Sequence, residues 1–371
     1  DNITDFVTTR IITRSGVVTN INNLKKVMAK NAKSIIIMNS AASWKTENEK
    51  NLADALVLKS IMSIIAVCRG KEHPSIVCEI HSDRDRDLAE NISSGSVKAL
   101  NEVSVLSRMI AQLSLSRNGL SVVYSDMVGF DGNEFYFYKP DNGWGGPLTF
   151  GESQNRFKSS TPMGISTSKG EITLNPPHNT PVTDDDELIV FAEDDSTISY
   201  FKNPIFTPTI ETIPTYSVKA RSHRLALLNW TTKTPIILEK LCTYLTKESE
   251  LCTYVSKKDI EMNNCIDSLN KSYPDIKLTI EELDINDLEK LKSIEPQNFD
   301  SILILSPGGN TIEEMDAYVI SLLIRIRQIL LLKMSAYAHN NNSKLKVWPK
   351  LITEVMDSDN IDIILNSGVE D

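Results

Sequence analysis

The feature that most limits the fold of this chain is an internal repeat, in which the same order of helices and strands occurs near both ends. Each copy has an amphipathic helix and a short strand, then a long apolar helix, then a strand followed by acidic residues. The corresponding segments are residues 22–40 and 286–306, residues 47–65 and 310–330, and residues 74–87 and 345–362. Such a repeat predicts two copies of one structural unit.

Individual residues align within these copies. An Asp-Ala pair lies in the apolar helix of both, with Asp54 in the first copy and Asp316 in the second. An acid lies in the strand that follows the helix, Glu79 in one copy and Glu354 in the other. The remaining differences in spacing are those expected from loops of different length.

The repeated segments predict an α/β fold. Short apolar strands that alternate with long helices are typical of βαβ units and a parallel sheet, with helices on both faces. Ligands of such sheets bind beyond the carboxyl ends of the strands. The candidate cofactor-binding residues at these positions are Asn39, Ser40, Asn229, Gly308 and Gly309. The alternative is that these residues belong to ordinary βα loops.

The middle of the chain has a different pattern. Residues 122–200 are rich in strands and turns, which predicts a small α+β module. A proline-punctuated stretch follows and predicts an extended linker. The second repeat has a complete βαβ start and the first does not, so we expect the first to be N-terminally incomplete. The predicted divisions are residues 1–121, 122–200, 201–217 and 218–371.

Composition excludes several classes of protein. The net charge of −10 and the absence of a basic stripe argue against a nucleic-acid partner. Five scattered cysteines without a CxxC pair predict reduced thiols. The most apolar segment, residues 317–332, contains Arg325 and Arg327, so we expect a buried helix and no direct membrane insertion. The first residue is not Met, and we expect a piece of a longer protein.

Several blocks of sequence, in the same order, resemble one family. These blocks are residues 13–38, 77–92, 120–137, 173–200 and 298–305. Their amino-acid sequences are similar to those of the Castor/Pollux-type ion channels, whose cytosolic region contains tandem RCK (regulator of K⁺ conductance) domains. The likeness covers nearly the whole chain and is weakest in residues 140–170 and 230–290. It implies two Rossmann-like RCK repeats with an RCK C-terminal-type module between them.

The resemblance also implies a function. In this family a homo-oligomeric ring, expected to be a tetramer, lies on the cytosolic side of a membrane beneath a cation-selective pore and regulates it. The pore domain would lie upstream of this chain. Two alternatives stay open: a soluble Trk/Ktr-type regulatory subunit of a K⁺ transporter, and a degenerate NAD-dependent oxidoreductase.

Nucleotide binding is not expected, because the chain has no GxGxxG sequence. The turn after the first strand of the second repeat is Asn229-Trp230, where a glycine would allow close approach of a pyrophosphate. The histidines lack zinc-site spacing, and no serine lies in a hydrolase elbow. We therefore expect no catalytic residues and no enzyme.

Calcium is the candidate ligand, since the family includes calcium-regulated rings and Ca²⁺ prefers carboxylate oxygens. The candidate metal residues are Glu79, Asp83, Asp85, Asp87, Asp126, Asp131, Asp194 and Asp195. The alternative for the DRDRD stretch is a solvated surface turn whose charges pair with one another. Asp184 to Asp186 resemble the hairpin turn of an RCK C-terminal subdomain, with metal binding as a further option.

Overall fold

In the computed structural model, the described residues are 10–68, 74–92, 95–116, 119–129, 132–205, 221–308, 311–339 and 348–366. The chain divides into two compact units. The first contains residues 1–115 and 220–371, and the second contains residues 116–219. The predicted linker therefore falls mostly on residues outside the described part.

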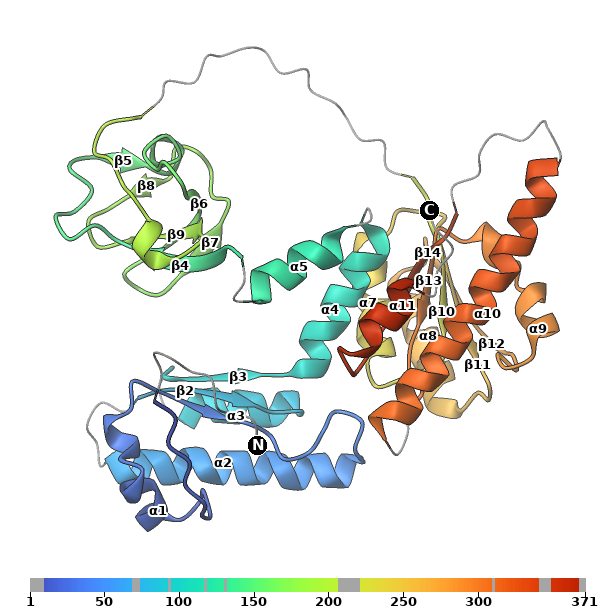
Figure 1. Cartoon of the computed structure of the whole chain (residues 1–371), viewed down its shortest axis with the longest axis horizontal. Coiled ribbons are helices and arrows are strands. Elements are labelled where there is room, and N and C mark those ends of the chain that lie inside the picture. Colours follow the sequence, from blue (N-terminus) through green and yellow to red (C-terminus); the bar gives the residue numbers. More distant parts are fainter. Residues whose placement is uncertain are drawn as a thin grey trace. The chain divides into compact units, whose positions relative to one another are not determined.

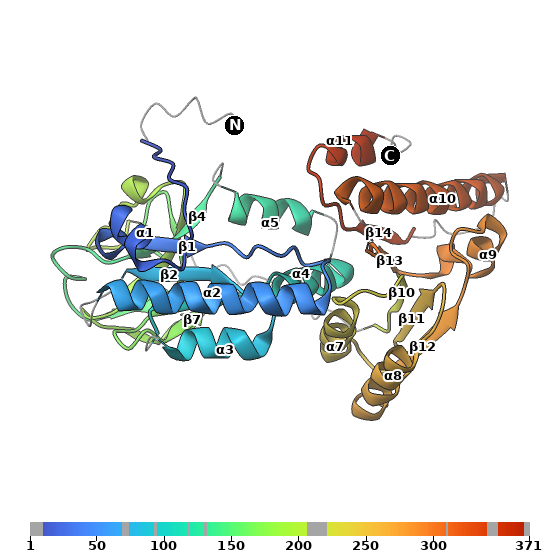
Figure 2. The ribbon, with the colours of Figure 1, turned by 90° about the horizontal axis from the view of Figure 1, so that it is seen from below.

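The first half of the larger unit contains a three-stranded parallel sheet. Its strands β1 (Ser34–Ile37), β2 (Ser75–Glu79) and β3 (Val97–Leu100) lie in sequence order. The helices are α1 (Ile21–Lys26), α2 (Glu47–Cys68) and α3 (Asp83–Ile92), with a 3₁₀ turn at Ala29–Asn31. The helices α2 and α3 lie on one face of this sheet (Figures 1 and 2), and side chains of both belong to its core. On the other face, Ile36 and Met38 are 71% and 74% exposed.

The second half contains a five-stranded parallel sheet. Its strands are β10 (Arg224–Leu228), β11 (Glu250–Val255), β12 (Lys277–Glu282), β13 (Ser301–Ile304) and β14 (Lys350–Thr353), in the order β12-β11-β10-β13-β14. The helices are α7 (Thr234–Tyr244), α8 (Ile260–Ser272), α9 (Leu288–Ser293), α10 (Ile312–His339) and α11 (Asn360–Asn366). The helices lie on both sides of the sheet, with α10 on one side and α7 and α8 on the other (Figure 2). The predicted parallel α/β class is confirmed.

The helix α4 (Glu102–Leu115) follows the first sheet in sequence but packs in the core of the second. Its residue Ala111 is 1% exposed and belongs to the cluster formed by β10, β13 and α7. The Ser301 hydroxyl donates to the Ser114 carbonyl at 2.8 Å, and the Lys350 ammonium donates to the Leu113 carbonyl at 2.8 Å. The first half therefore supplies one wall of the second core.

The repeat is visible at the level of single hydrogen bonds. Asp54 is fully buried and accepts hydrogen bonds from the backbone N–H groups of His81 (3.1 Å) and Ser82 (2.9 Å). Asp316 is 2% exposed and accepts from the N–H groups of Met356 (2.8 Å) and Asp357 (2.9 Å). Each carboxyl group thus joins the long helix to the residues after the next strand.

An amide side chain donates a third hydrogen bond to each of these two carboxyl groups. We call the carboxyl group and its three hydrogen bonds an anchor. The Asn39 amide donates to Asp54 at 2.8 Å, and the Asn360 amide donates to Asp316 at 2.9 Å. The two amides come from different places, one after β1 and the other from the start of α11. The backbone part of the anchor is therefore the part that the two copies share.

The smaller unit contains an antiparallel sheet with the order β4-β9-β6-β7 (Figure 1). Its strands are β4 (Glu134–Tyr138), β6 (Thr161–Ser166), β7 (Ile172–Leu174) and β9 (Glu187–Ala192), with a second pair formed by β5 (Leu148–Thr149) and β8 (Pro181–Val182). The helices are α5 (Leu120–Val128) and α6 (Phe150–Ser153), and a 3₁₀ turn spans Asp195–Thr197. Its core contains Trp144, Phe150 and Leu188, each at most 1% exposed.

The acidic run before β9 forms a turn, as predicted, but the turn does not close a hairpin, because β8 and β9 belong to different sheets. Asp184 accepts a hydrogen bond from the Trp144 N–H at 3.0 Å. Asp186 is 7% exposed and accepts from both the N–H (2.9 Å) and the hydroxyl (2.7 Å) of Thr183. These contacts use the carboxyl groups to hold the loop together, as Asp side chains commonly do in turns.

The DRDRD stretch is not a turn, as the alternative supposed, but the first turns of α3. Asp83 and Asp85 lie in the first turn of this helix, where negative charge is favourable because of the free N–H groups. The Arg86 guanidinium lies 2.8 Å from Asp83 and 3.4 Å from Asp87, so the expected pairing of charges within the stretch is present.

Among the described helices, α2 has the length and apolar composition of a membrane-spanning segment. Val57, Ile61 and Ile64 of this helix are at most 3% exposed and pack on the first sheet. Core helices often have these properties, so α2 gives only weak support for a membrane span. The apolar segment of α10 is likewise packed, with Val319 and Ile326 fully buried.

Candidate functional site

A cavity of about 290 Å³ lies at the carboxyl end of the second sheet. One wall comes from residues 43–47 and Lys50, in the loop after β1 and the start of α2. The other wall comes from residues 231–233 and 306–308, together with Met315, Glu354 and Met356. The strand order reverses between β10 and β13, which is the usual ligand position of such sheets. The cavity therefore combines a switch point of the second half with a loop of the first.

Lys233 and Glu354 form an ion pair within this cavity. The Lys233 Nζ contacts the Glu354 Oε1, and the two side chains are only 6% and 12% exposed. Lys233 is the residue before α7, and its N–H donates to the Thr231 hydroxyl at 3.1 Å. The turn after β10 thus places an ammonium group beside the carboxylate at the end of β14.

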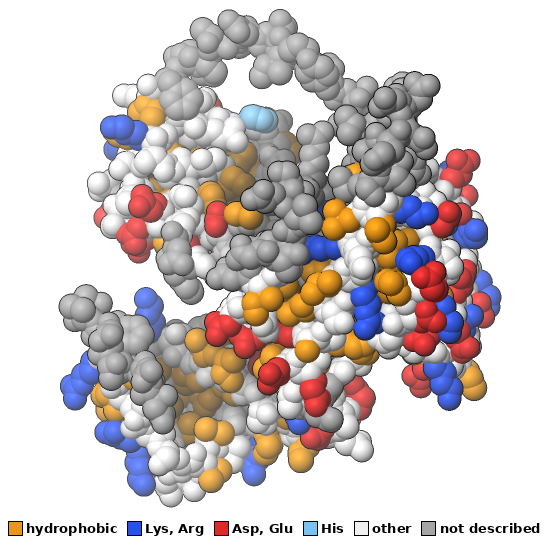
Figure 3. Space-filling view, turned by 45° about the vertical axis from the view of Figure 1, so that its right-hand side comes forward, with side chains coloured by type: hydrophobic (Ala, Val, Ile, Leu, Met, Phe, Trp, Pro, Cys, Tyr) orange, Lys and Arg blue, Asp and Glu red, His pale blue; other side chains and the backbone are white. Residues whose placement is uncertain are grey.

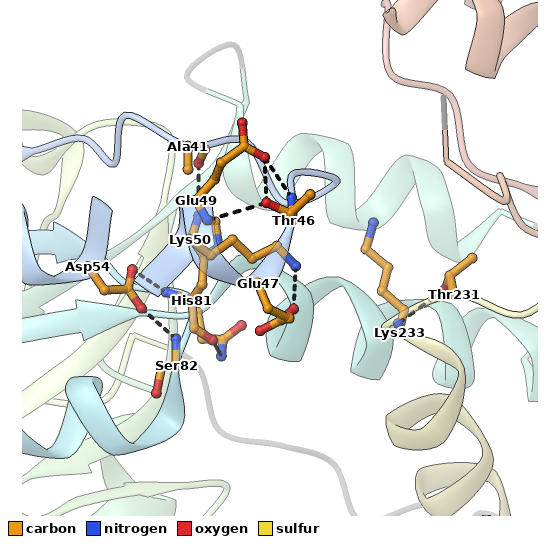
Figure 4. Close-up of polar contacts among 11 residues, drawn as sticks. Ala41, Thr46, Glu47, Glu49, Lys50, Asp54, His81, Ser82, Thr231 and Lys233 are labelled. Carbon is orange, nitrogen blue, oxygen red and sulfur yellow. Dashed lines mark hydrogen bonds and ion pairs between the residues drawn. The ribbon is translucent and has the colours of Figure 1, made fainter. Parts of the chain in front are cut away.

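Lys50 lies on the wall that the first half contributes (Figure 4). Its side chain is 6% exposed, and its Nζ lies 3.1 Å from an oxygen of Glu47, which is 75% exposed. Thr46 and Glu49 form hydrogen bonds with each other at the N-terminus of the same helix. The Glu49 carboxylate accepts from the N–H (3.0 Å) and the hydroxyl (2.7 Å) of Thr46. These two hydrogen bonds lower the pKa of Glu49, chiefly through the hydroxyl.

Of the five candidate cofactor-binding residues, Gly308 lines the cavity, with a φ of 92°. Gly309 lies outside the described residues. Ser40 is exposed in the loop after β1. The Asn39 side chain is engaged by Asp54 and by the Ala41 N–H at 2.9 Å, so its polar atoms serve the anchor described above.

Asn229 has a structural role at the end of β10. It is 4% exposed, and its amide donates to the Leu305 carbonyl at 2.7 Å and accepts from the Tyr318 hydroxyl at 3.2 Å. Its φ of 78° is in the left-handed region, where a fingerprint glycine would be free of strain. Pro235, in the first turn of α7, also lacks the N–H that a pyrophosphate would use. The turn is therefore poorly suited to a dinucleotide.

The candidate metal residues are divided between the two units. Glu79, Asp83, Asp85 and Asp87 belong to the larger unit, whereas Asp126, Asp194 and Asp195 belong to the smaller one, and Asp131 lies outside the described residues. Glu79 accepts from the Asn39 N–H at 3.1 Å, and Asp194 caps the turn that follows it. Hydrogen bonds from Ser196 lower the pKa of Asp194. Within the described ranges, no group of three His, Cys, Asp or Glu side chains is placed to hold a metal ion.

The cysteines are all free thiols, as predicted. Four are buried, and Cys265 is partly buried. Burial raises the pKa of both Cys78 and Cys242 to about 11. Their thiols are therefore protonated at neutral pH and serve as packing groups.

Sequence reasoning missed Lys50 and Lys233, and it noted Glu354 only as the counterpart of Glu79. Neither lysine lies in a recognisable motif. The one signal available was position, since Lys233 follows the first strand of a complete βαβ start and Glu354 ends a strand of the same predicted sheet. Both positions lie at the carboxyl edge, where side chains from distant strands meet.

Comparison with known proteins identifies relatives of this chain. Residues 103–206 match the family model described as "Castor and Pollux, part of voltage-gated ion channel". The chain is 26% identical over 395 residues to the ion channel POLLUX of Lotus japonicus, covering 99% of this chain and 41% of that protein. It is 28% identical over 335 residues to the ion channel CASTOR of the same plant, covering 88% of this chain and 38% of that protein.

A solved structure of the GsuK channel bound to NAD is also similar, with a TM-score of 0.43 and 12% identity, over 96% of this chain and 51% of that one. The chain spans about two fifths of the length of the curated relatives above. Those relatives are ion channels rather than enzymes. The resemblance predicted from the sequence is confirmed, and this chain is related to the Castor/Pollux ion channels.

Proposed function

We propose that this chain is a cytosolic ligand-sensing region that regulates the pore of a Castor/Pollux-like cation channel. The observation that carries this proposal is the relation of nearly the whole chain to such channels. Its net charge of −10 and the mixture of acidic and basic side chains on its surface (Figure 3) are consistent with an aqueous setting. Regulation would consist of a ligand shifting the population between two conformations of the assembled region.

In this proposal the two parallel sheets are RCK-type repeats within the predicted divisions 1–121 and 218–371, and residues 122–200 are the intervening module. The paired anchors of Asp54 and Asp316 support the assignment. Four copies would form a ring beneath a pore encoded upstream. We propose the ring, the pore and its preference for K⁺ or another cation from the resemblance to the Castor/Pollux family.

We also propose that the first repeat is N-terminally incomplete. Alignment of β1 with β13, with Ser34 at the position of Ser301, places Ile36 and Met38 at the positions of Leu303 and Leu305. The first pair is 71% and 74% exposed, whereas the second pair is 0% and 1% exposed beneath α4 and α7. The uncovered face has an apolar hollow of about 310 Å³ that also includes Val105. A strand and helix equivalent to β10 and α7 would cover it.

A chimera tests the regulatory function. The chain would replace the matching region of Lotus japonicus POLLUX, and ion currents would be recorded from membrane patches exposed to cytosolic extract. We expect currents that respond to the extract. A matched chimera carrying Asp316→Ala, which weakens the fold of the second half, should lose the response.

Currents identical with and without this region would contradict the proposal. Loss of current combined with binding of the isolated chain to a separate transporter would favour the soluble regulatory subunit instead.

Calcium is the ligand that we propose for this region, on the basis of its resemblance to a family that includes calcium-regulated rings. Because a ligand of the native state stabilises it by mass action, Ca²⁺ should raise the melting temperature in a concentration-dependent way, and Mg²⁺ should not. The triple variant Asp83→Asn, Asp85→Asn, Asp87→Asn tests the first cluster, and Asp194→Asn with Asp195→Asn tests the second. Equal shifts with Ca²⁺ and Mg²⁺, or none with either, would count against calcium sensing.

A further inference from the structure

We propose that the cavity between the β1–α2 loop and the second sheet binds a small anion with several acceptor oxygens, namely phosphate or a small phosphate ester. The proposal that this cavity binds an anion rests on the contacts of Lys50 and Lys233 described above. As the place where the channel senses a ligand, it rests on the proposed function. The site differs from the predicted cofactor positions, because its charged groups are Lys50 and Lys233 rather than glycine-rich turns.

The first argument is the number of unused hydrogen-bond donors. An ammonium group has three N–H donors and no acceptor. Lys50 and Lys233 are each only 5% exposed, and each has a single acceptor among the described residues, Glu47 for the one and Glu354 for the other. Buried cations normally have their donors satisfied, because leaving them unpaired is costly. Acceptor oxygens inside the cavity would complete both groups.

The second argument is charge. Three lysines line the cavity, Lys45, Lys50 and Lys233, against two glutamates, Glu47 and Glu354. The Glu47 side chain is 75% exposed, so water screens its charge more than it screens that of Lys50. Lys45 is exposed beside the cavity and carries a further positive charge. The balance favours an anion over a metal ion.

The third argument concerns size and lining. A cavity of about 290 Å³ is at the lower limit for sites that hold small organic ligands. Thr231, Thr232 and Ser306 line it, and a hydroxyl group of this kind can donate to a phosphate oxygen. Trp44 and Met315 provide apolar surface for the rest of an ester. The lining therefore fits a compact phosphate ester better than a dinucleotide.

Binding would involve both halves of the larger unit at once. Lys50 belongs to α2 of the first half, and Lys233 precedes α7 of the second. An anion held by both ammonium groups would favour the arrangement in which these residues face the same cavity. That is how binding at this place would act on conformation.

The test is isothermal titration calorimetry with inorganic phosphate, at ionic strength matched with chloride. We expect saturable heat for the unmodified chain and at least about tenfold weaker binding for Lys50→Gln and for Lys233→Gln. The Glu354→Gln variant should bind more tightly, because it frees Lys233 and removes a competing negative charge. Lys30→Gln, an exposed lysine outside the cavity, is the matched control and should bind like the unmodified chain.

The heat of binding is measured rather than a shift in melting temperature, because phosphate stabilises proteins in general by exclusion from their surface. Circular dichroism confirms that each variant is folded. If a lysine variant does not fold, Glu354→Gln still decides when it is compared with Asp267→Asn, which removes the same charge outside the cavity and should leave the affinity unchanged. Equal affinity in all variants, or no saturable heat in the unmodified chain, would overturn the proposal. This outcome is independent of whether the POLLUX chimera conducts.

Discussion

Replacing Asp316 by alanine should lower the free energy of unfolding by about 3–5 kcal/mol, because it removes a buried carboxyl group that accepts three hydrogen bonds. The donors are the N–H groups of Met356 and Asp357 and the amide of Asn360. The loss would detach the residues after β14 from α10. Urea denaturation, followed by circular dichroism, measures the effect.

The matched control is Asp267→Ala, an exposed acid in α8, for which we expect a change within about 0.5 kcal/mol. Asp54→Ala should resemble Asp316→Ala, since Asp54 receives the same number of hydrogen bonds in the first half. A loss at Asp316 no larger than at Asp267 would show that water replaces the carboxyl group without cost.

The single substitution Glu354→Gln should destabilise the chain by about 3–5 kcal/mol, because it leaves the Lys233 ammonium buried without its counter-charge. Replacing both residues by methionine should return most of this loss, since apolar side chains of similar volume need no partner. The exposed pair Lys247–Asp275, at 3.0 Å with side chains 81% and 59% exposed, is the control. Asp275→Asn should cost less than about 1 kcal/mol.

Urea denaturation in phosphate-free buffer measures these differences. A double variant no more stable than Glu354→Gln would show that the pair contributes through packing rather than charge. Adding phosphate should reduce the loss caused by Glu354→Gln if the anion occupies the cavity.

The repeat, the parallel sheets and the reduced cysteines could be predicted because each depends on local pattern. Apolar strands such as residues 301–304 have the composition of buried strands, and a helix of suitable length follows each one. Even the alignment of Asp54 with Asp316 followed from an Asp-Ala pair in the sequence. What the alignment could not supply was the reason, which is a set of hydrogen bonds to residues 27 and 41 positions away.

The cavity could not be predicted because it is formed by contacts between segments that are far apart in the sequence. Lys233 and Glu354 are 121 positions apart, and Lys50 comes from the other half of the chain. Asn229 was assigned to a ligand from its position, but its amide instead bridges Leu305 and Tyr318. For the DRDRD stretch, a surface turn was the alternative to a metal site, because alternating charges contain no apolar period that would indicate a helix. Its acids instead begin a helix.

The position of α4 has a consequence for how the chain is made. This helix leaves the ribosome long before the sheet that it covers, and its residues Ala111 and Leu115 have no second core to enter until β10 and β13 have been synthesised. The bond from Lys350 to the Leu113 carbonyl requires the last strand as well. The second core can therefore close only near the end of translation, and during that interval α4 exposes an apolar face that chaperones could recognise.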